Sequence, residues 1–277
     1  AITNQFLKEF PKVKNVNLLE LGPGNGLLSM DIYDYLKSKN VIVNDLTLLE
    51  KSEYFREKIS EKSEVKVNFI KNIYDYKIDN GDVVFIYSNE FFDAIGSKQF
   101  IYDNGNFNEI KISKNNDEYL LIKDSTIISR ELLNIYSSYN FKDNDILEHS
   151  NLILNILSDI QKLEFKKYFF TTTDYGYTKL PFKSTLRLLS NHKKLNLFDK
   201  FENVDYSFGV NFELMNSFFL KNNPSIIYQK DLILNNLPSE YLKSSDKNIK
   251  EMIDLISGKK FGGMGTSFLN LSFKKNE

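Results

Sequence analysis

The chain has 277 residues, of which 42% are hydrophobic and 26% are charged, with a net charge of -1 and no cysteine. These proportions fit a globular protein with ample core. The absence of cysteine excludes disulfides and thiolate metal sites. The near-neutral charge gives no basic field that would attract nucleic acid or a membrane surface. No apolar run approaches the roughly 20 residues that span a bilayer. The two histidines, His149 and His192, lie far apart in the sequence, so we expect no metal site.

The first elements of the chain predict the start of an α/β sheet. Ile2 to Phe10 is an amphipathic run that predicts a helix ended by Pro11. Leu18 to Gly26 reads LLELGPGNG, and the amphipathic run LLSMDIYDYLKS follows it. An apolar run, a glycine loop and a helix in this order predict the first unit of a doubly wound sheet, whose ligands bind at the carboxyl ends of the strands.

The spacing of Gly22, Gly24 and Gly26 distinguishes between ligands. Dinucleotide-binding loops follow the pattern G-x-G-x-x-G, which seats a pyrophosphate on a helix N-terminus. Here the pattern is G-P-G-N-G and it follows Glu20. An acid beside the loop would repel a pyrophosphate, but it suits a cationic ligand such as S-adenosylmethionine. We therefore predict a methyl-donor site at Glu20 and the three glycines, with a purely structural glycine turn as the alternative.

The next two predicted strands add candidate donor-binding residues. Val41 to Leu49 predicts a second strand, and Glu50 follows it. A carboxylate in this place can accept both hydroxyls of a bound ribose, although an ordinary strand-end acid is the alternative. Val65 to Ile70 predicts a third strand, after which Asn72 and Ile73 could hold an adenine ring between an amide and an apolar side chain.

The fourth predicted strand, Asp82 to Tyr87, is nearly all apolar and should be buried on both faces. It leads into SNEFFDAIGSKQF, where we expect a helix to begin and Asn89, Glu90 and Asp93 to gather beside the donor site. Buried charges without partners cost several kcal/mol, which favours function over helix capping for these groups. Asn89-x-x-Phe92 is also similar to the Asn-x-x-aromatic element of amino-group methyltransferases.

The second half of the chain predicts an insertion and further strands. Asp103-Asn104-Gly105 lies between alternating runs and predicts a β-hairpin. Glu148 precedes a predicted helix from Asn151 to Leu163, as helix-start acids do. Tyr168 to Thr173 predicts the fifth strand, with Asp174 at its ligand edge. The segment from Ser184 to His192 is expected to be irregular, with Arg187 and His192 as candidate substrate-binding or loop-anchoring groups.

The sequence shows no repeat, long linker or low-complexity tract. We therefore expect a single domain over residues 1–277, with a core over 16–95 and 166–277 and an insertion over about 97–165. The chain starts at Ala1 with no signal-like segment, which suggests that it is trimmed.

Together these elements make the chain resemble the MidA-like family of S-adenosylmethionine-dependent methyltransferases, whose mitochondrial members resemble complex I assembly factors that methylate arginine. The matching elements follow the family's order: ELGPGNG at Glu20 to Gly26, Glu50 with Ser52 and Arg56, NEFFDA at Asn89 to Ala94, Gln99-Phe100, DYGY at Asp174 to Tyr177, STLR at Ser184 to Arg187 with His192, and GMG at Gly263 to Gly265. The resemblance implies a class I methyltransferase fold, a Rossmann-like doubly wound mixed sheet with a β-hairpin insertion and extra helices. It also implies that the donor lies across Glu20, the glycine loop and Glu50.

The chain departs from the family pattern at several positions. Asn25 stands where the family usually has arginine, and Gly96 where it commonly has proline. The family's His-Val-Asp-Phe element appears as Gly209-Val210-Asn211-Phe212, and the family's N-terminal region is missing. These differences bear on substrate recognition more than on the fold.

The chemistry implied by the resemblance is methyl transfer to an arginine of a partner protein, such as a respiratory complex I subunit. Carboxylates can hold a guanidinium bidentately and accept its proton, so we predict that Glu90 and Asp93 clamp the acceptor, with Asp174 as a third acid. Asn89 would fix the donor ribose or the incoming nitrogen, and Phe92 and Arg187 would contact the substrate. The compartment would be the cytoplasm in a bacterium or the mitochondrial matrix in a eukaryote.

Other functions stay open from the sequence. One is an amino methyltransferase acting on a nucleic-acid base, suggested by Asn89-x-x-Phe92 but disfavoured by the lack of clustered Lys and Arg. Another is a non-catalytic assembly factor that retains a methyltransferase fold, suggested by the altered element at Gly209 to Phe212. A nicotinamide enzyme is disfavoured by the glycine spacing.

Overall fold

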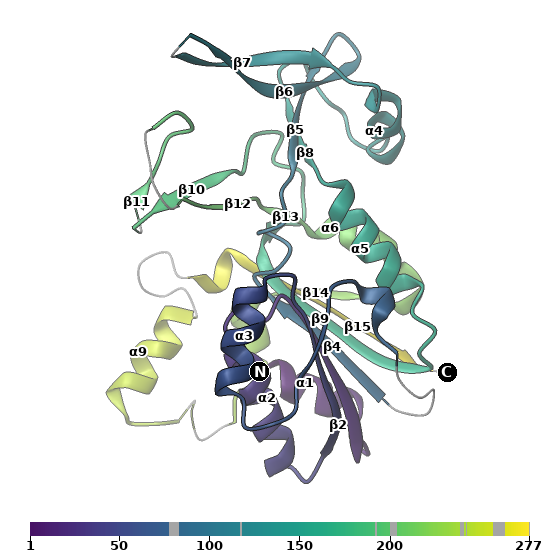
Figure 1. Ribbon diagram of the computed structural model, residues 1–277, viewed down its shortest axis with the longest axis vertical. Helices are drawn as coiled ribbons and strands as arrows, with labels where there is room; N and C mark the ends of the chain where they lie inside the picture. The colour runs from purple at the N-terminus through teal and green to yellow at the C-terminus, as the bar shows by residue number, and fades with distance from the viewer. Residues whose placement is uncertain are drawn as a thin grey trace. The chain divides into compact units, whose positions relative to one another are not determined.

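The computed structural model describes residues 1–77, 83–116, 118–191, 193–199, 204–238, 241, 243–256 and 264–276 (Figure 1). The chain forms two compact units. The first consists of Ala1–Phe91, Ile156–Gly176 and Phe212–Glu277, and the second of Phe92–Asn155 and Tyr177–Asn211. The chain therefore leaves the first unit twice and returns to it twice, and the first departure comes directly after Phe91.

The first unit is built on a mixed sheet with the strand order β14-β15-β9-β4-β1-β2-β3. Its strands are β1 (Asn15–Leu21), β2 (Ile42–Leu49), β3 (Asn68–Ile70), β4 (Val83–Asn89), β9 (Lys167–Tyr177), β14 (Ser225–Tyr228) and β15 (Phe268–Asn276). Strands β3, β2, β1, β4 and β9 are parallel, whereas β15 is antiparallel to β9 and β14 to β15. The order turns back at β1, which pairs with β2 on one side and with β4 on the other. Ligands of open α/β sheets bind at such a switch point, so the topology places the site at the carboxyl end of β1. The predicted fold class is confirmed.

Three helices pack on one face of this sheet: α1 (Ile2–Glu9), α2 (Leu27–Ser38) and α3 (Glu53–Lys62) (Figure 1). The apolar stripe of α1 buries Phe6, whose ring stacks on Phe85 of β4 at 4.6 Å between centroids. Leu36 of α2 and Ile59 of α3 join the same cluster. Burying such side chains contributes about 1.5–3 kcal/mol each, and this packing holds the three helix starts against the sheet.

The remaining elements of the first unit are α6 (Phe212–Phe218), α7 (Gln229–Asn236), α9 (Lys247–Ile256) and the 3-10 helices η1 (Ile73–Asp75), η2 (Leu220–Asn222) and η3 (Met264–Thr266). Helix α5 (Asn151–Gln161) contains the division between the units at Ile156. Among the described residues, no helix is long and apolar enough to span a bilayer.

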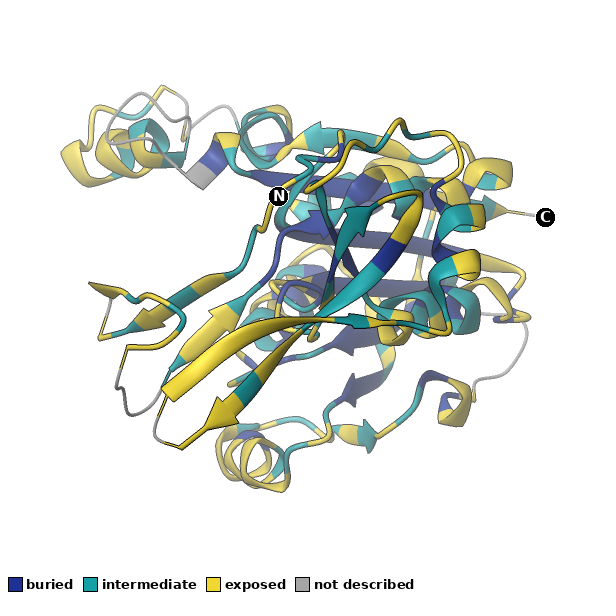
Figure 2. Ribbon diagram, turned by 90° about the horizontal axis from the view of Figure 1, so that it is seen from above, coloured by how far each residue is buried: buried dark blue, intermediate teal, exposed yellow. Residues whose placement is uncertain are grey.

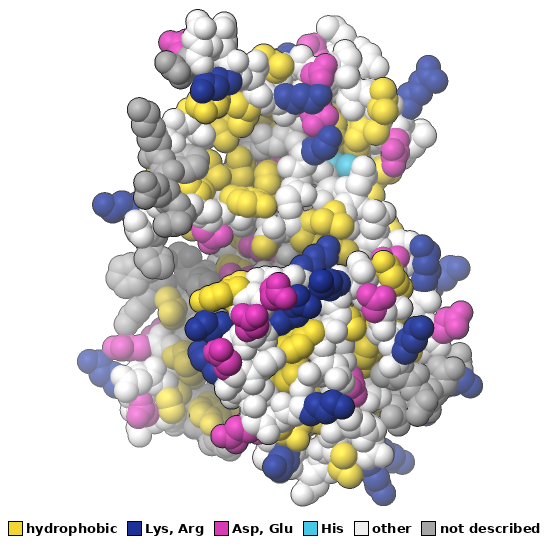
Figure 3. All heavy atoms as spheres, in the orientation of Figure 1, with side chains coloured by type: hydrophobic (Ala, Val, Ile, Leu, Met, Phe, Trp, Pro, Cys, Tyr) yellow, Lys and Arg dark blue, Asp and Glu magenta, His cyan; other side chains and the backbone are white. Residues whose placement is uncertain are grey.

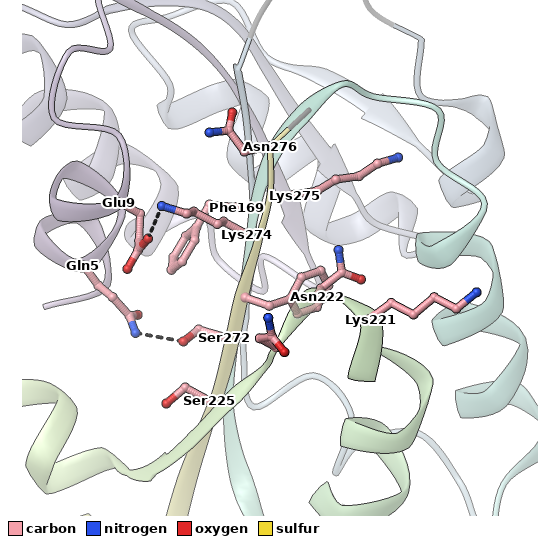
Figure 4. A pocket seen from close by; sticks show the side chains of 12 residues that line it. Gln5, Glu9, Phe169, Lys221, Asn222, Ser225, Ser272, Lys274, Lys275 and Asn276 are labelled. Carbon is pink, nitrogen blue, oxygen red and sulfur yellow. Dashed lines mark hydrogen bonds and ion pairs between the residues drawn. The ribbon is translucent and has the colours of Figure 1, made fainter.

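A polar cavity of about 520 Å³ opens on the first unit near the end of β15 (Figure 4). Beside it, Gln5 Nε2 donates to Ser272 Oγ at 2.9 Å, and Lys274 pairs with Glu9 at 2.8 Å, which ties α1 to β15. The last residue of β15, Asn276, lies opposite Lys167, the first residue of β9. The cavity is therefore at the amino edge of the parallel strands, away from the glycine loop, and it is not the predicted donor site.

The second unit contains two antiparallel sheets. One has the order β7-β6-β5-β8, with β5 (Lys98–Asp103), β6 (Asn106–Asn115), β7 (Glu118–Ser125) and β8 (Ile146–His149). The other has the order β11-β10-β12, with β10 (Arg187–Ser190), β11 (Lys193–Lys194) and β12 (Asp205–Ser207). The unit also holds α4 (Ser129–Ile135) and β13 (Val210–Asn211). The predicted hairpin is confirmed, because Asn104 and Gly105 both take a positive φ between β5 and β6. Figure 2 shows how exposed the outer strand β7 is.

Most predicted strands and helices are confirmed, but one predicted helix is wrong. No helix begins after β4: Glu90 takes a φ of +51°, which is outside the right-handed helical region, and only a turn forms from Phe92 to Ile95. Strand β9 also runs beyond Thr173, so Asp174 lies inside a strand rather than after one.

Candidate functional site

The glycine loop between β1 and α2 has a backbone that requires glycine. Gly22, Gly24 and Gly26 take φ values of +68°, +54° and +78°, which side chains rarely adopt. A Cβ on Gly26 would lie 3.0 Å from Ile59 of α3, so this glycine allows α2 and α3 to pack closely. A Cβ on Gly24 would meet no atom within 4 Å. The loop therefore presents bare backbone to an open space at Gly24.

One aromatic ring, that of Phe91, lies against this loop, and it is not among the site residues that the sequence predicts. A Cβ on Gly22 would come within 2.4 Å of Cδ2 of Phe91, so the ring occupies the space beside the glycine. Phe91 is the second residue after β4 and is only partly buried. Sequence pattern favoured its neighbour Phe92, which is fully buried.

Glu20, near the end of β1, is almost inaccessible, with 2% of its surface exposed. Its carboxylate accepts a hydrogen bond from the Ser29 hydroxyl of α2, and Ser29 Oγ lies 2.9 Å from the Tyr87 hydroxyl of β4. Burial raises the pKa of Glu20 from 4.5 to about 7, and the Ser29 hydrogen bond opposes this shift. The pKa of Tyr87 is also raised, mainly because the hydroxyl is buried and secondly because of the nearby charge of Glu20. Glu20 is thus buried beside α2 and β4 rather than exposed at the edge of the sheet.

Glu50 directly follows β2 beside the same loop. The N–H of Gly22 donates to the carbonyl of Leu49 at 3.1 Å, which ties the loop to the end of β2. The half-buried Glu50 accepts the N–H of Ser52 through Oε1 at 2.7 Å. Ser52 in turn caps α3 by accepting the N–H of Phe55, as its position before the helix predicts. The structure therefore brings Glu50 to the glycine loop, as predicted.

Asn72 and Ile73 follow β3, the strand next to β2 in the sheet. Strand β3 is parallel to β2, with Ile70 opposite Leu49. Ile73 is buried, and the side-chain amide of Asn72 donates to Asp75 at 3.3 Å. Both residues thus lie at the carboxyl edge, on the side of β2 away from β1.

Asn89 is the last residue of β4, on the other side of β1, and Glu90 follows it; both are exposed. The Asn89 side-chain amide donates to Glu90 Oε1 at 3.3 Å. The backbone N–H of Glu90 donates to the carbonyl of Thr173 at 3.0 Å. Asp174, the next residue of β9, is fully buried, and its two oxygens accept the N–H groups of Phe91 at 3.1 Å and Tyr175 at 3.0 Å. Asp174 therefore binds backbone groups of this edge.

Three predicted site residues belong to the second unit. Asp93 is buried, and its carbonyl accepts the N–H of Phe208 at 3.0 Å. Phe92 is fully buried, and Arg187 is an exposed residue at the start of β10. Because the helix after β4 is absent, Glu90 and Asp93 do not share a helix face. His192 lies outside the described residues.

The structure corrects the interpretation of Glu148. This residue lies in β8 rather than at a helix start, and it is buried. Its carboxylate accepts hydrogen bonds from the Gln99 side chain at 2.8 Å, the Ser184 hydroxyl at 3.2 Å and the Thr185 N–H at 2.9 Å. The Thr185 hydroxyl also donates to Glu148 and accepts the N–H of Gly209. Glu148 therefore anchors the segment that begins at Ser184.

A family model described as "Putative S-adenosyl-L-methionine-dependent methyltransferase" matches residues 1–226. The chain belongs to this family. This methyltransferase is also similar to two solved structures from Burkholderia thailandensis. One is an uncharacterized ACR superfamily protein, 13% identical, with a TM-score of 0.81 over 98% of this chain and 77% of that chain. The other, of the same superfamily, is bound to S-adenosyl-homocysteine and is 14% identical, with a TM-score of 0.76 over 98% of this chain and 74% of that chain.

At these identities the structural likeness shows the fold of the methyltransferase, and the family shows its cofactor, S-adenosyl-L-methionine. No curated protein matches the chain in sequence. The residues at the carboxyl edge fit this cofactor, because Gly24 leaves open space and Glu50 supplies a carboxylate at the end of the adjacent strand. Among the described residues, no group of three His, Asp or Glu side chains could hold a metal ion.

Proposed function

We propose that the methyltransferase methylates an arginine guanidinium of a partner protein, such as a subunit of respiratory complex I, as its resemblance to the MidA-like family implies. The observation that carries the proposal is the position of Glu90. This exposed carboxylate stands at the end of the central strand β4, next to the residue whose ring contacts the glycine loop. An acid there can hold a cationic acceptor beside the donor.

Different residues at the carboxyl edge of the sheet would bind different parts of S-adenosylmethionine. Glu50 would accept the ribose hydroxyls, and Asn72 with Ile73 would flank the adenine. The bare backbone at Gly24 lets the donor approach closely, because no side chain stands there. Glu20 is buried and hydrogen-bonded to Ser29, so we assign it no direct contact with the donor.

On the acceptor side, the proposal assigns proton handling to Glu90. S-adenosylmethionine, when bound, supplies a methyl group carried on a sulfonium. In-line transfer needs the reacting atoms aligned at about 3–3.5 Å, and a guanidinium is a weak nucleophile because it stays protonated. Glu90 would hold the guanidinium through two hydrogen bonds and take its proton as the new bond forms, while Asn89 orients the Glu90 carboxylate. We assign no part in the clamp to Asp93, which is buried and belongs to the second unit.

The test is methyl transfer from deuterated-methyl S-adenosylmethionine, followed by mass spectrometry of arginine in respiratory-chain subunits. Wild-type protein should add labelled methyl groups, and Glu90→Gln should abolish the label while S-adenosyl-homocysteine still binds. Glu53→Gln, an exposed acid in the first turn of α3, is the matched control and should keep wild-type labelling. Label on lysine or on nucleic acid instead of arginine would reject the proposed acceptor.

Two observations weigh against a nucleic-acid base as the acceptor. Phe92 of the Asn-x-x-aromatic element is fully buried, so its ring is not available for stacking on a base. Figure 3 shows basic and acidic side chains interspersed on the drawn face of the first unit, rather than a basic patch. A non-catalytic assembly factor would be favoured over an enzyme if the protein showed no binding of S-adenosyl-homocysteine.

A further inference from the structure

The turn that follows β4 is held in an unfavourable backbone conformation. Glu90 has a φ of +51°, in the left-handed region that costs a residue other than glycine about 1 kcal/mol or more. Such a conformation persists only where the surrounding structure imposes it. Two hydrogen bonds from β9 do so here, since the carbonyl of Thr173 binds the N–H of Glu90 and the carboxylate of Asp174 binds the N–H of Phe91.

The geometry of Asp174 suits an anchor better than a proton acceptor. Its side chain is fully buried, and each of its two oxygens accepts a backbone N–H. Because the Asp174 side chain is fully buried, a substrate guanidinium could reach its oxygens only if the residues that cover it moved.

Asp174 is connected to the donor loop through Phe91. The N–H that Asp174 holds belongs to the residue whose ring lies against Gly22. The same bond fixes the turn in which Glu90 is exposed at the edge. One buried carboxylate thus constrains both a group beside the donor loop and the acid proposed to meet the acceptor.

We infer that Asp174 is a positioning residue, which acts through the Phe91 N–H to seat the Phe91 ring on the donor loop and to present Glu90 at the carboxyl edge. This inference rests on the proposed function only for the part played by Glu90. The part played by Phe91 concerns donor binding alone, and it can be measured without the acceptor.

The experiment is a double-mutant cycle on the affinity for S-adenosyl-homocysteine, measured by calorimetry. Asp174→Asn places an NH₂ group where an oxygen accepted an N–H, and the affinity should fall about tenfold, the size of one lost hydrogen bond to a charged group. Phe91→Ala should cause a fall of similar size. If Asp174 acts through Phe91, the double variant should bind no more weakly than Phe91→Ala alone. Additive losses would overturn the inference.

A second readout separates positioning from a general loss of structure. Hydrogen exchange of the backbone around Glu90 and Phe91 should accelerate in Asp174→Asn and stay at the wild-type rate in Glu90→Gln. If Asp174→Asn does not fold, two measurements on Phe91→Ala still test the contact of the Phe91 ring with Gly22. These are its backbone hydrogen exchange and its affinity for S-adenosyl-homocysteine. In that case wild-type affinity in Phe91→Ala overturns the inference.

The outcomes also distinguish this inference from the proposed function. If wild-type protein and Asp174→Asn bind S-adenosyl-homocysteine equally while Asp174→Asn has lost methyl transfer, Asp174 acts on the acceptor and the positioning role fails. If the cycle is non-additive but no arginine is methylated, the positioning role stands and the proposed acceptor fails.

Discussion

Replacing Glu20 with glutamine should change how the stability of the protein depends on pH. Burial raises the pKa of this carboxyl from 4.5 to about 7, so the folded state holds the proton more tightly than the unfolded chain does. The resulting stabilisation is complete below about pH 4.5 and is lost as the pH rises through about 7. For one group with these two pKa values, the loss between pH 5.5 and pH 8.0 is about 2 kcal/mol of unfolding free energy.

The assay is urea unfolding of wild-type protein and Glu20→Gln in parallel at the two pH values. A glutamine cannot ionise and can still bind the Ser29 hydroxyl. Between pH 5.5 and pH 8.0 the unfolding free energy of the variant should therefore fall by about 2 kcal/mol less than that of the wild type. Glu53→Gln removes an equal charge from an exposed position and should decline as the wild type does. If Glu20→Gln and wild type lose the same free energy between these pH values, Glu20 is not the buried acid described above.

Three further predictions concern packing and anchoring. Gly22→Ala should destabilise the protein more than Gly24→Ala in urea unfolding, because its Cβ would meet the Phe91 ring whereas that of Gly24 meets open space; equal losses would contradict this. Phe6→Ala should cost about 3–5 kcal/mol, since it empties the stack on Phe85, and a loss below 1 kcal/mol would refute the packing. Thr185→Val should speed hydrogen exchange around Ser184 and Gly209, because it removes a donor to Glu148 and the acceptor of the Gly209 N–H; unchanged exchange would argue against this anchor.

Local patterns in the sequence were sufficient for much of the fold and for the donor edge. The apolar run before Glu20 and the glycines after it predict β1, its loop and α2, because each signal lies within a few residues of the feature it specifies. The same holds for Glu50 after β2, and for Asn104-Gly105 between β5 and β6. Parallel pairing then brings Glu50 to the loop, since neighbouring strands end at the same edge.

The features that sequence patterns missed depend on residues far apart in the chain. The left-handed turn at Glu90 is imposed by Thr173 and Asp174, more than 80 residues later. A helix after β4 was therefore a reasonable but wrong prediction, because no local residue signals those hydrogen bonds. Glu148 was likewise misread, since its partners Ser184 and Thr185 follow it by 36 and 37 residues.

The choice between Phe91 and Phe92 could not be made from sequence either. The two rings are adjacent and chemically identical, and only the fold decides that Phe92 is buried and Phe91 lies on Gly22. The Asn-x-x-aromatic spacing therefore pointed to the ring that is less available. The contact between Gly22 and the Phe91 ring can be recognised only when the pairing of β1 with β4 is known.

The most direct test of the donor site is calorimetric titration of S-adenosyl-homocysteine into the wild-type protein and two variants. Glu50→Ala removes the carboxylate at the end of β2, and Glu9→Ala removes an acid beside the polar cavity at the opposite edge of the sheet. We predict one site per chain, with an affinity at least tenfold lower in Glu50→Ala and unchanged in Glu9→Ala. No binding to wild type, or binding that survives Glu50→Ala and is lost in Glu9→Ala, would contradict the placement of the donor at the glycine loop.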